Sequence, residues 1–335
     1  MHTSVSNKIS LPKVFLTRIL PDIGMKMIHE IAEVEVWPER LPPPYEVLLE
    51  KVKGKDGLVC MLTDQIDAQL IEAAGGSLKV ISQMAVGYDN INIAAMTAKG
   101  IPVGHTPGVL TDATADLTWA LLMAAARRVV EADKEVRLGH WQTWEPTMLL
   151  GVNISGATLG IIGCGRIGQA VARRARGFNM RVLYHNRLRL PLELEQSLDI
   201  KYQDLDVLLK ESDFITIHTS LTNDTYHLFS DVQFQMMKPT SILINTARGA
   251  IVDPEALRKA LINGQIAGAA LDVTTPEPIP TDSPLLGLDN IIITPHIGSA
   301  SYQTRAQMAM MTASNLAAGL KGERLPHCVN PEVYA

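Results

Sequence analysis

The sequence of 335 residues is about twice the usual length of one domain, so we expect two domains. Hydrophobic residues make up 47% and charged residues 19% of the chain, as in ordinary globular α/β proteins. The net charge of −5 argues against a nucleic-acid or membrane partner, and no apolar run approaches the roughly 20 residues that span a bilayer.

The N-terminal stretch Met1–Lys13 is polar and lacks the apolar core of a secretory signal. The three cysteines are far apart and form no CxxC pair: Cys60, Cys164 and Cys328. The nine histidines form no HxH or HExxH pattern. We therefore expect a cytoplasmic protein without disulfides and without a metal site.

The first hundred residues alternate short apolar runs with helical patterns. The runs at Val14–Leu20, Gly57–Leu62 and Leu78–Val86 are typical of strands. The patterns at Asp22–Ala32 and Ile66–Ala74 lie between them and are typical of helices. This alternation predicts a parallel sheet covered by helices on both faces.

A long helical pattern covers about Thr111–Leu138 and follows the turn-rich stretch His105–Gly108, which favours a crossing between domains. A second strand–helix series then begins. Its six predicted strands are Thr158–Ile162, Arg181–Tyr184, Phe214–His218, Ser241–Asn245, Ala267–Val273 and Ile291–Thr294. One of its helices begins at the N-cap Asp253 and stops at Gly264, and the last helical pattern covers Ser301–Gly319.

A glycine-rich motif follows the first strand of this second series. Residues Gly163–Gly168 have the form GxGxxG and open a helical pattern. The glycines permit a tight turn and a close approach to a pyrophosphate, and the helix N-terminus adds N–H donors and positive potential. We predict a dinucleotide site that includes Gly163, Gly165, Arg166, Ile167 and Gly168. The alternative is a glycine-rich turn that binds nothing.

The acidic residue that usually binds the ribose of NAD is missing at the end of the next strand. Asn186 stands in its region, where it can still bind a ribose hydroxyl, and Arg187 and Arg189 follow. A carboxylate would repel a 2′-phosphate, whereas arginines attract it. The sequence therefore favours NADPH as the cofactor, with NADH possible. The alternative is that both arginines belong to a solvated surface patch.

Three charged residues, Arg248, Glu277 and His296, each follow the carboxyl end of a late predicted strand. Ligands of open parallel sheets bind beyond these ends. Arginine can grip a carboxylate through parallel N–H bonds, and histidine can exchange a proton with a carbonyl oxygen. A carboxylate behind the imidazole fixes its tautomer and favours its charged form. This set suits the reduction of a 2-keto acid, although each residue alone is ordinary at a strand end.

With these motifs, the sequence resembles the D-isomer-specific 2-hydroxyacid dehydrogenases, and within them the glyoxylate/hydroxypyruvate reductases. The resemblance covers nearly the whole chain and is most specific at Gly163–Gly168, Asn245–Gly249, Leu271–Pro278 and Pro295–Ala300. It implies an α/β fold of two Rossmann/flavodoxin-like lobes with parallel sheets and a cofactor cleft between them. The substrate-binding domain would comprise residues 1–106 and 299–335, and the dinucleotide-binding domain residues 107–298.

The resemblance also implies roles for single residues. Arg248, Glu277 and His296 would be catalytic, and backbone N–H groups of the loop Met84–Asp89 would bind the substrate carboxylate. Asp272 would hold the nicotinamide carboxamide. Further cofactor-binding residues would be Thr114, Thr219, Asn245 and Thr246. Substrate-binding residues would be Leu62, Val86, Gly87, Arg248, Ser299 and Trp144.

The same resemblance implies a homodimer. Trp141 and Trp144 would lie in an arm at the dimer interface, with Trp144 reaching the active site of the partner subunit. The alternative is that both tryptophans pack within their own chain.

We therefore expect an NAD(P)H-dependent reductase that converts glyoxylate to glycolate and hydroxypyruvate to D-glycerate. A reductase of bulkier 2-keto acids and a phosphite dehydrogenase are alternatives in the same class. Formate is disfavoured, because formate dehydrogenases of this superfamily pair the histidine with glutamine, where this chain has Glu277. The alternative in a different class is an NAD(P)-sensing corepressor scaffold.

Overall fold

The computed structural model describes residues 10–335. The chain divides into two compact units, with crossings at Leu110–Thr111 and Ala300–Ser301. These crossings lie two to four residues beyond the expected boundaries at 106/107 and 298/299. Most of the N-terminal stretch Met1–Lys13, in which we expect no secretory signal, lies outside the described residues. None of the helices within 10–335 is long and apolar enough to cross a membrane.

Within the described residues, the first unit contains a five-stranded parallel sheet in the order β2-β1-β3-β4-β5. Every residue of β3 and β4 is buried, as expected for strands covered on both faces. The strands are β1 Lys13–Leu16, β2 Glu33–Val36, β3 Gly57–Cys60, β4 Val80–Gln83 and β5 Val103–Gly104. The helices are α1 Asp22–His29, α2 Tyr45–Lys51, α3 Ala68–Ala74, α4 Ile93–Ala98, α12 Tyr302–Leu320 and the 3₁₀ turn η4 Pro331–Tyr334.

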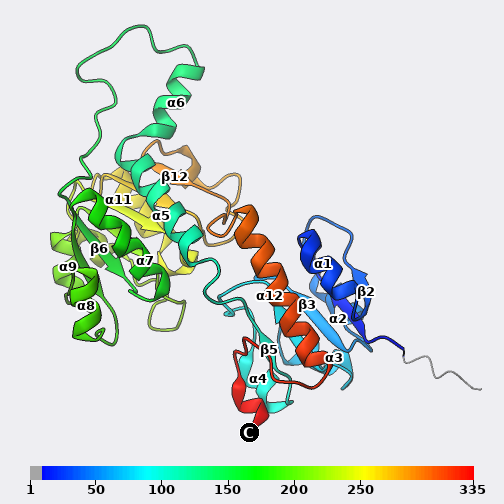
Figure 1. The fold of residues 1–335 in the computed structure, drawn as a ribbon. Coiled ribbons are helices and arrows are strands. Elements are labelled where there is room, and N and C mark those ends of the chain that lie inside the picture. The colour runs from blue at the N-terminus through cyan, green and yellow to red at the C-terminus, as the bar shows by residue number, and fades with distance from the viewer. Residues whose placement is uncertain (1–9) are drawn as a thin grey trace, which may run out of the picture. The chain divides into compact units, whose positions relative to one another are not determined.

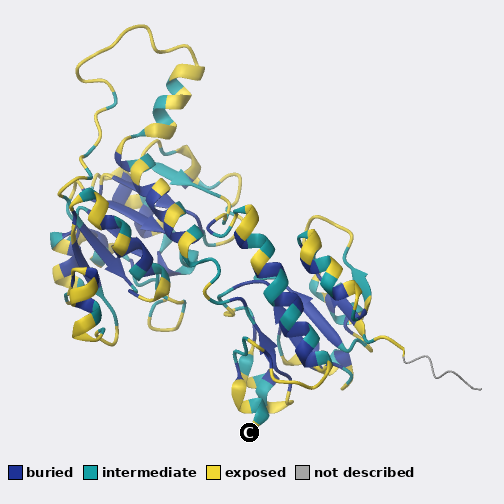
Figure 2. Ribbon diagram, in the orientation of Figure 1, coloured by how far each residue is buried: buried dark blue, intermediate teal, exposed yellow. Residues whose placement is uncertain are grey.

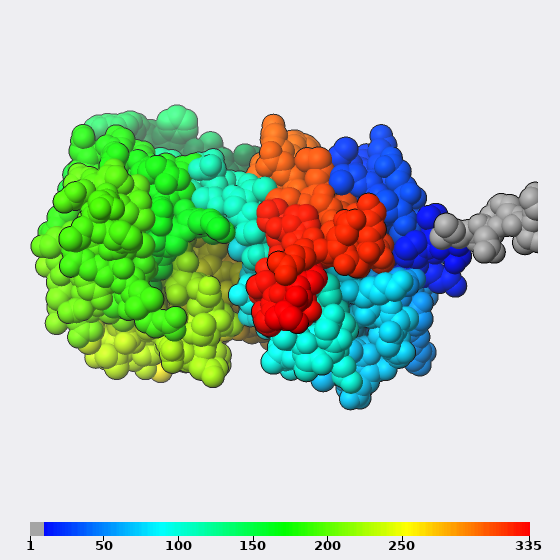
Figure 3. Space-filling model, turned by 60° about the horizontal axis from the view of Figure 1, so that its bottom comes forward, coloured from blue at the N-terminus to red at the C-terminus, as the bar shows by residue number. Residues whose placement is uncertain are grey.

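The C-terminal helix α12 completes this first unit. It lies beside α1 over the sheet (Figure 1), and two glycines allow the close approach. A Cβ atom on Gly24 of α1 would lie 2.7 Å from the Ala309 Cβ, and one on Gly319 would lie 2.4 Å from Val80. The C-terminal residues, red in Figure 3, lie against the cyan segment around α4, where the Asn330 amide donates to the Ile101 carbonyl.

The described part of the second unit is built on a seven-stranded parallel sheet in the order β12-β11-β10-β9-β6-β7-β8. The strand order reverses between β6 and β9, and ligands of open α/β sheets bind at such a reversal. The strands are β6 Thr158–Ile162, β7 Arg181–His185, β8 Ile200–Tyr202, β9 Phe214–Ile217, β10 Ile242–Asn245, β11 Gly268–Leu271 and β12 Ile291–Ile293.

Helices cover both faces of this sheet and leave its central strands dark blue in the burial view (Figure 2). Helices α5 and α7 pack on one face, where Trp119 of α5 stacks on Phe178 at 4.8 Å. Helices α9, α10 and α11 border the core of the other face. The helices are α5 Thr111–Ala126, α6 Val129–Arg137, α7 Arg166–Ala175, α8 Leu192–Leu198, α9 Leu205–Glu211, α10 Asp231–Met236 and α11 Pro254–Ile262, with 3₁₀ turns η1 Arg176–Phe178, η2 Gly249–Ile251 and η3 Pro284–Gly287.

The expectation of one continuous helix over Thr111–Leu138 is wrong. Helix α5 ends at Ala126, and Arg128 adopts a left-handed conformation with φ +51° before α6 begins. The Arg128 guanidinium binds Glu131 in the first turn of α6 at 2.6 and 2.8 Å, which offsets the backbone strain. The apolar pattern continues through the break, so nothing local in the sequence indicates it.

Some predicted ends of helices are confirmed, and some predicted ends of strands are shifted. Asp253 caps α11 by accepting from the N–H groups of Glu255 and Ala256, and Gly264 follows the helix with φ +65°. Several predicted strands are too long, because the apolar residues after them belong to loops at the carboxyl edge of the sheet. The edge strands β2 and β8 were not predicted, since each is short and half exposed.

Candidate active site

The glycine loop between β6 and α7 has the geometry of a phosphate site. Gly163 has φ +88°, and a Cβ there would lie 2.5 Å from the Thr219 nitrogen. A Cβ on Gly168 would lie 2.5 Å from the Gly163 carbonyl oxygen, whereas one on Gly165 would point into open space. Two glycines are therefore required by packing, and Gly165 leaves its backbone open to a ligand. The N-terminus of α7, at Arg166 and Ile167, adds N–H donors for an anion.

Asn186 is tied directly to this glycine loop. Its Oδ1 accepts the backbone N–H of Cys164 at 2.6 Å. The bond turns the amide nitrogen, a donor, away from the loop. Asn186 thus follows β7 in the place expected for a ribose-binding residue, and the exposed Arg187 comes next.

Arg189, also expected to bind the cofactor, is bonded to a carboxylate of its own unit. Its guanidinium forms two bonds of 2.7 Å to Glu195 in α8, and Tyr184 also donates to that carboxylate. The Arg189 bonds lower the pKa of Glu195 to about 2. The Tyr184 hydroxyl in turn accepts the N–H of Leu190 at 2.9 Å. Arg189 therefore anchors the loop after β7, which leaves Arg187 as the nearby cation not committed to Glu195.

Cys164 inside the glycine loop is fully buried, and burial raises the pKa of its thiol to about 12. The thiolate, which is the nucleophilic form, is therefore suppressed. This agrees with a packed residue. Among residues 10–335, no group of three or more side chains is arranged to hold a metal ion.

His296 and Glu277 form a hydrogen-bonded pair. The His296 Nδ1 lies 2.6 Å from the Glu277 Oε1, and their side chains are 25% and 34% exposed. Because a carboxylate only accepts, we place the proton of the neutral ring on Nδ1, so that Nε2 is the unprotonated nitrogen. His296 has φ +54°, an uncommon conformation for a residue with a side chain.

The buried Asp272 holds the loop that carries His296. One carboxylate oxygen accepts from the Thr294 hydroxyl at 2.6 Å and the Ile297 N–H at 2.8 Å, and the other accepts from the Gly298 N–H at 2.7 Å. The Asp272 carbonyl also accepts the N–H of His296 at 2.9 Å. These bonds stabilise the left-handed His296. Oδ2 keeps a second lone pair for a further donor.

Arg248 is presented by a turn that Asn245 organises. The buried Asn245 amide donates to the Arg248 carbonyl at 2.9 Å and accepts the N–H of Ala247 at 3.0 Å. A Cβ on Gly249 would lie 1.9 Å from the Thr274 carbonyl oxygen, so only glycine allows this contact. The Arg248 turn therefore packs against the start of the loop that carries Glu277.

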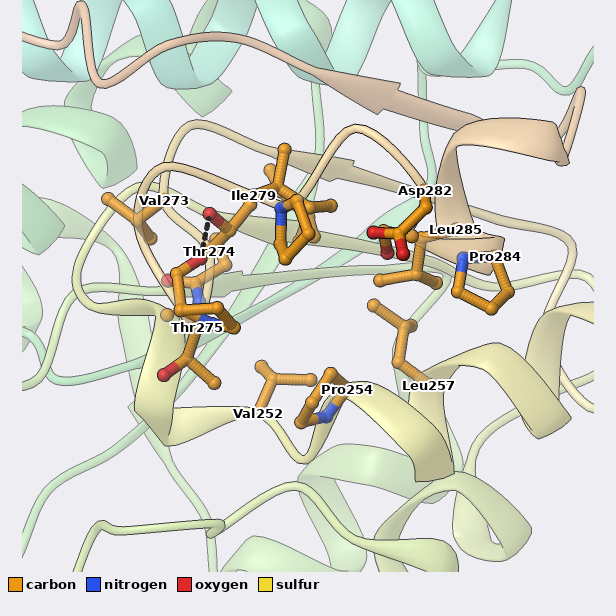
Figure 4. Close-up of a pocket in the computed structure, with 16 residues that line it drawn as sticks. Val252, Pro254, Leu257, Val273, Thr274, Thr275, Ile279, Asp282, Pro284 and Leu285 are labelled. Carbon is orange, nitrogen blue, oxygen red and sulfur yellow. Dashed lines mark hydrogen bonds between the residues drawn. The ribbon is translucent and has the colours of Figure 1, made fainter.

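A cavity of about 320 Å³ lies behind that loop (Figure 4). Val252, Pro254 and Leu257 line one side, and Thr274 and Thr275 line the other. Its lining is largely apolar and includes none of the three expected catalytic residues. We therefore do not place the substrate there.

A chain of polar side chains links α5 to the strand ends, and sequence reasoning missed most of it. The Thr118 hydroxyl donates to the Thr114 carbonyl at 2.8 Å and lies 2.9 Å from the Thr246 hydroxyl, which faces the His218 Nδ1 at 3.5 Å. The His218 Nε2 is enclosed, without a hydrogen-bond partner among the described residues. Burial lowers the pKa of His218 to about 3, so the ring is neutral. The only sequence signal is polar residues in an apolar helix.

The other residues expected to bind substrate come from segments of the chain other than those of Arg248 and Glu277. Leu62 follows β3, and Val86 and Gly87 follow β4, all at the carboxyl edge of the first unit's sheet. Ser299 is half-buried in the second unit, just after the His296 loop. Trp144 is 78% exposed and Trp141 is 61% exposed, so neither packs in the core of its own chain.

Residues 119–298 match the family described as "D-isomer specific 2-hydroxyacid dehydrogenase, NAD binding domain". The chain belongs to the D-isomer-specific 2-hydroxyacid dehydrogenases. A glyoxylate reductase of Korarchaeum cryptofilum is 52% identical to it over 323 residues, which cover 96% of this chain and 97% of the relative. The expected family and the α/β fold with two parallel sheets are thus confirmed.

Solved structures agree with this membership. The TT0316 protein of Thermus thermophilus superposes with a TM-score of 0.88 at 47% identity, covering 95% of this chain and 99% of that one. An NADPH-dependent glyoxylate/hydroxypyruvate reductase of Sinorhizobium meliloti, in complex with NADP and malonate, gives a TM-score of 0.84 at 28% identity, covering 96% and 98%. This 2-hydroxyacid dehydrogenase is therefore an NAD(P)-dependent oxidoreductase. The open Gly165 and the donors at the start of α7 fit such a cofactor.

Proposed function

We propose that this dehydrogenase reduces glyoxylate to glycolate and hydroxypyruvate to D-glycerate, with NADPH as its preferred cofactor. The observation that carries the proposal is the 2.6 Å bond between His296 and Glu277, in which Glu277 belongs to a loop packed against the Arg248 turn. This gives an acid, its orienting carboxylate and a carboxylate-binding cation in one region of a sheet edge. The glyoxylate reductase of K. cryptofilum supports the substrate.

The chemistry assigns one task to each side chain. When bound, the reduced nicotinamide supplies a hydride to the keto carbon. Arg248 binds the substrate carboxylate through paired N–H donors and polarises the neighbouring carbonyl. The His296 Nε2–H donates its proton to the carbonyl oxygen, and Glu277 stabilises the charged imidazole before that transfer. In the reverse direction, His296 takes the proton from the hydroxyl.

The cofactor preference rests on the loop after β7. Asn186 places no charge where a 2′-phosphate would lie, and Arg187 can bind that phosphate. Arg189 contributes only indirectly to phosphate binding, because its guanidinium is bonded to Glu195. NADP in the S. meliloti reductase is consistent with the assignment. NADH remains a weaker second cofactor in this proposal.

We also infer that the enzyme is a homodimer. Helix α6 has no buried residue, and it and the arm after it expose large apolar side chains: Val129, Val130, Val136, Leu138, Trp141, Trp144 and Leu150. Figure 1 shows this arm looping out from the second unit. So many exposed large apolar side chains within one segment favour a protein interface. We assign Trp144 to the substrate pocket of the partner subunit.

The experiment that tests the substrate is a panel of 2-keto acids with NADPH and with NADH. Glyoxylate and hydroxypyruvate should have higher kcat/KM than pyruvate or phenylpyruvate. A preference for phenylpyruvate would favour the bulkier-acid alternative, and oxidation of phosphite in the reverse assay would favour the phosphite alternative. Cofactor oxidation by the purified chain alone would separate an enzyme from a corepressor scaffold.

A further inference from the structure

A buried polar network lies at the carboxyl ends of β1, β3 and β4 in the first unit. At its centre is Gln83, the last residue of β4, which is fully buried. Its Nε2 donates to the Gly87 carbonyl at 2.6 Å, and its Oε1 accepts from the Asn90 amide at 2.8 Å. One side chain therefore binds both the middle and the end of the loop that follows β4.

Three consecutive carbonyl groups of this loop accept hydrogen bonds, one from Gln83 and two from residues that follow β5. The Ala85 carbonyl accepts the N–H of Thr106 at 2.9 Å, the Val86 carbonyl lies 3.0 Å from the His105 Nδ1, and the Gly87 carbonyl binds Gln83. In a trans peptide, the C=O and the following N–H point in opposite directions. The N–H groups of residues 86–88 are therefore turned away from the network. Successive N–H groups on one side of a loop form a site for a carboxylate.

Asn90 connects this loop to the turn after β3. Its Nδ2 also faces the Met61 carbonyl at 3.1 Å and the Asp64 carbonyl at 2.8 Å, at the two ends of the turn that contains Leu62. The buried Asp64 carboxylate closes the turn by accepting the Met61 N–H at 2.7 Å and the hydroxyl of Thr17. The same network thus fixes two neighbouring segments of the sheet edge.

We propose that Gln83 and Asn90 are positioning residues for the keto-acid substrate. They touch neither substrate nor cofactor. Gln83 holds the Gly87 carbonyl inward, and Asn90 holds the Gln83 amide in place, so that the N–H groups of the loop can bind the substrate carboxylate. This inference rests on the proposed function, and it adds two residues that set the affinity for the substrate rather than the rate of the chemical step.

The test compares Gln83→Met and Asn90→Ala with the wild type. Met keeps the length of Gln without its hydrogen bonds. Loss of ordered N–H bonds to a carboxylate should raise KM for glyoxylate about 10- to 100-fold. Because the bonds are made to the ground state and the transition state alike, kcat should stay within about threefold, and the Kd for NADPH should not change.

The matched control is Asn92→Ala. Asn92 is an exposed loop asparagine two residues further on, whose side chain accepts the N–H of Ala95 and caps α4. Its loss should lower stability without raising KM. Hydrogen–deuterium exchange of residues 84–90 provides a second readout, since exchange should be faster in both network variants and unchanged in the control.

The outcomes separate this inference from the proposed function. If the wild type reduces no 2-keto acid, the proposed function fails, and unchanged exchange in the loop would then overturn the network as well. If the wild type is active and both variants keep its KM, this inference alone is overturned. If Gln83→Met does not fold, Asn90→Ala decides by the same measurements.

Discussion

The Nδ1 of His296 lies 2.6 Å from the Oε1 of Glu277, a residue nineteen positions earlier on a different strand-end loop. The bond fixes which ring nitrogen carries the proton in the neutral ring. Asp272 supports the loop beneath the same ring by binding the N–H groups of His296, Ile297 and Gly298. The His296 ring is thus oriented by Glu277, and its loop is held by Asp272.

His296→Ala should lower kcat for glyoxylate reduction by about 10²- to 10⁴-fold, because general acid catalysis is lost. Binding of NADPH should be retained, since the Asp272 bonds are to the backbone of this loop and to Thr294. Steady-state kinetics and a cofactor titration check both points. A kcat close to that of the wild type would exclude His296 as the acid.

Glu277→Gln should lower kcat for glyoxylate reduction by about 10- to 100-fold. A neutral amide stabilises the charged imidazole less than a carboxylate does, and it no longer fixes which ring nitrogen carries the proton. Steady-state kinetics measures this loss, and a kcat equal to that of the wild type would make Glu277 a structural residue only.

The homodimer can be tested by its mass. Light scattering at micromolar concentration should give twice the chain mass of 36.5 kDa. Val136→Glu places a charge on the exposed apolar side of α6 and should shift the equilibrium toward monomer. Val232→Glu, at an equally exposed site of α10, is the control and should remain dimeric. A monomeric wild type would contradict the interface.

His218 predicts a loss of stability in mild acid. Burial lowers its pKa in the folded protein to about 3, whereas an unfolded histidine titrates near its ordinary 6.5. Between these values the unfolded chain binds a proton that the folded chain does not. The free energy of unfolding therefore decreases by about 1.4 kcal/mol for each unit by which the pH is lowered. Urea unfolding should therefore show a shallower pH dependence in His218→Asn. His140→Asn, in the exposed arm, is the control, and equal slopes in wild type and His218→Asn would refute this burial.

Strand periodicity places Arg248, Glu277 and His296 at one edge of a sheet, because parallel strands deliver their carboxyl ends there. Each is ordinary at a strand end, so their selection as the catalytic set also needed the resemblance to the family. The glycine pattern and its position between a strand and a helix indicated the phosphate loop. Capping residues such as Asp253 are equally local and were predicted with their helix.

The features that the sequence did not indicate depend on side-chain contacts that form only in the folded chain. Arg187 and Arg189 are equivalent in the sequence, and only the position of α8 commits one of them to Glu195. The bonds of Asn245 to its own turn and of Gln83 to Gly87 are also invisible, since an amide side chain can bind almost any neighbour. The break at Arg128 depends on a backbone angle that its side chain does not favour.

The cofactor preference gives the sharpest test of the site, because the chain offers two nearby arginines with different surroundings. Arg187→Ala should reduce the ratio of kcat/KM for NADPH over NADH by about tenfold, the worth of one charge-assisted bond at a partly exposed site. Arg189→Ala should change this ratio less, and should instead lower thermal stability, because it leaves the buried carboxylate of Glu195 without its cation.

Asn186→Asp combined with Arg187→Ala should move the preference toward NADH by tens- to about a hundredfold. The new carboxylate can still accept the N–H of Cys164, so the glycine loop keeps its anchor while a 2′-phosphate is repelled. The ranking of 2-keto acids should not change, since Arg248 and His296 are untouched. The ratio of kcat/KM for the two cofactors in wild type and variants decides the matter. A wild type that prefers NADH would refute the assignment, and an equal effect of Arg189→Ala would mean that Arg189 leaves Glu195 to bind the phosphate.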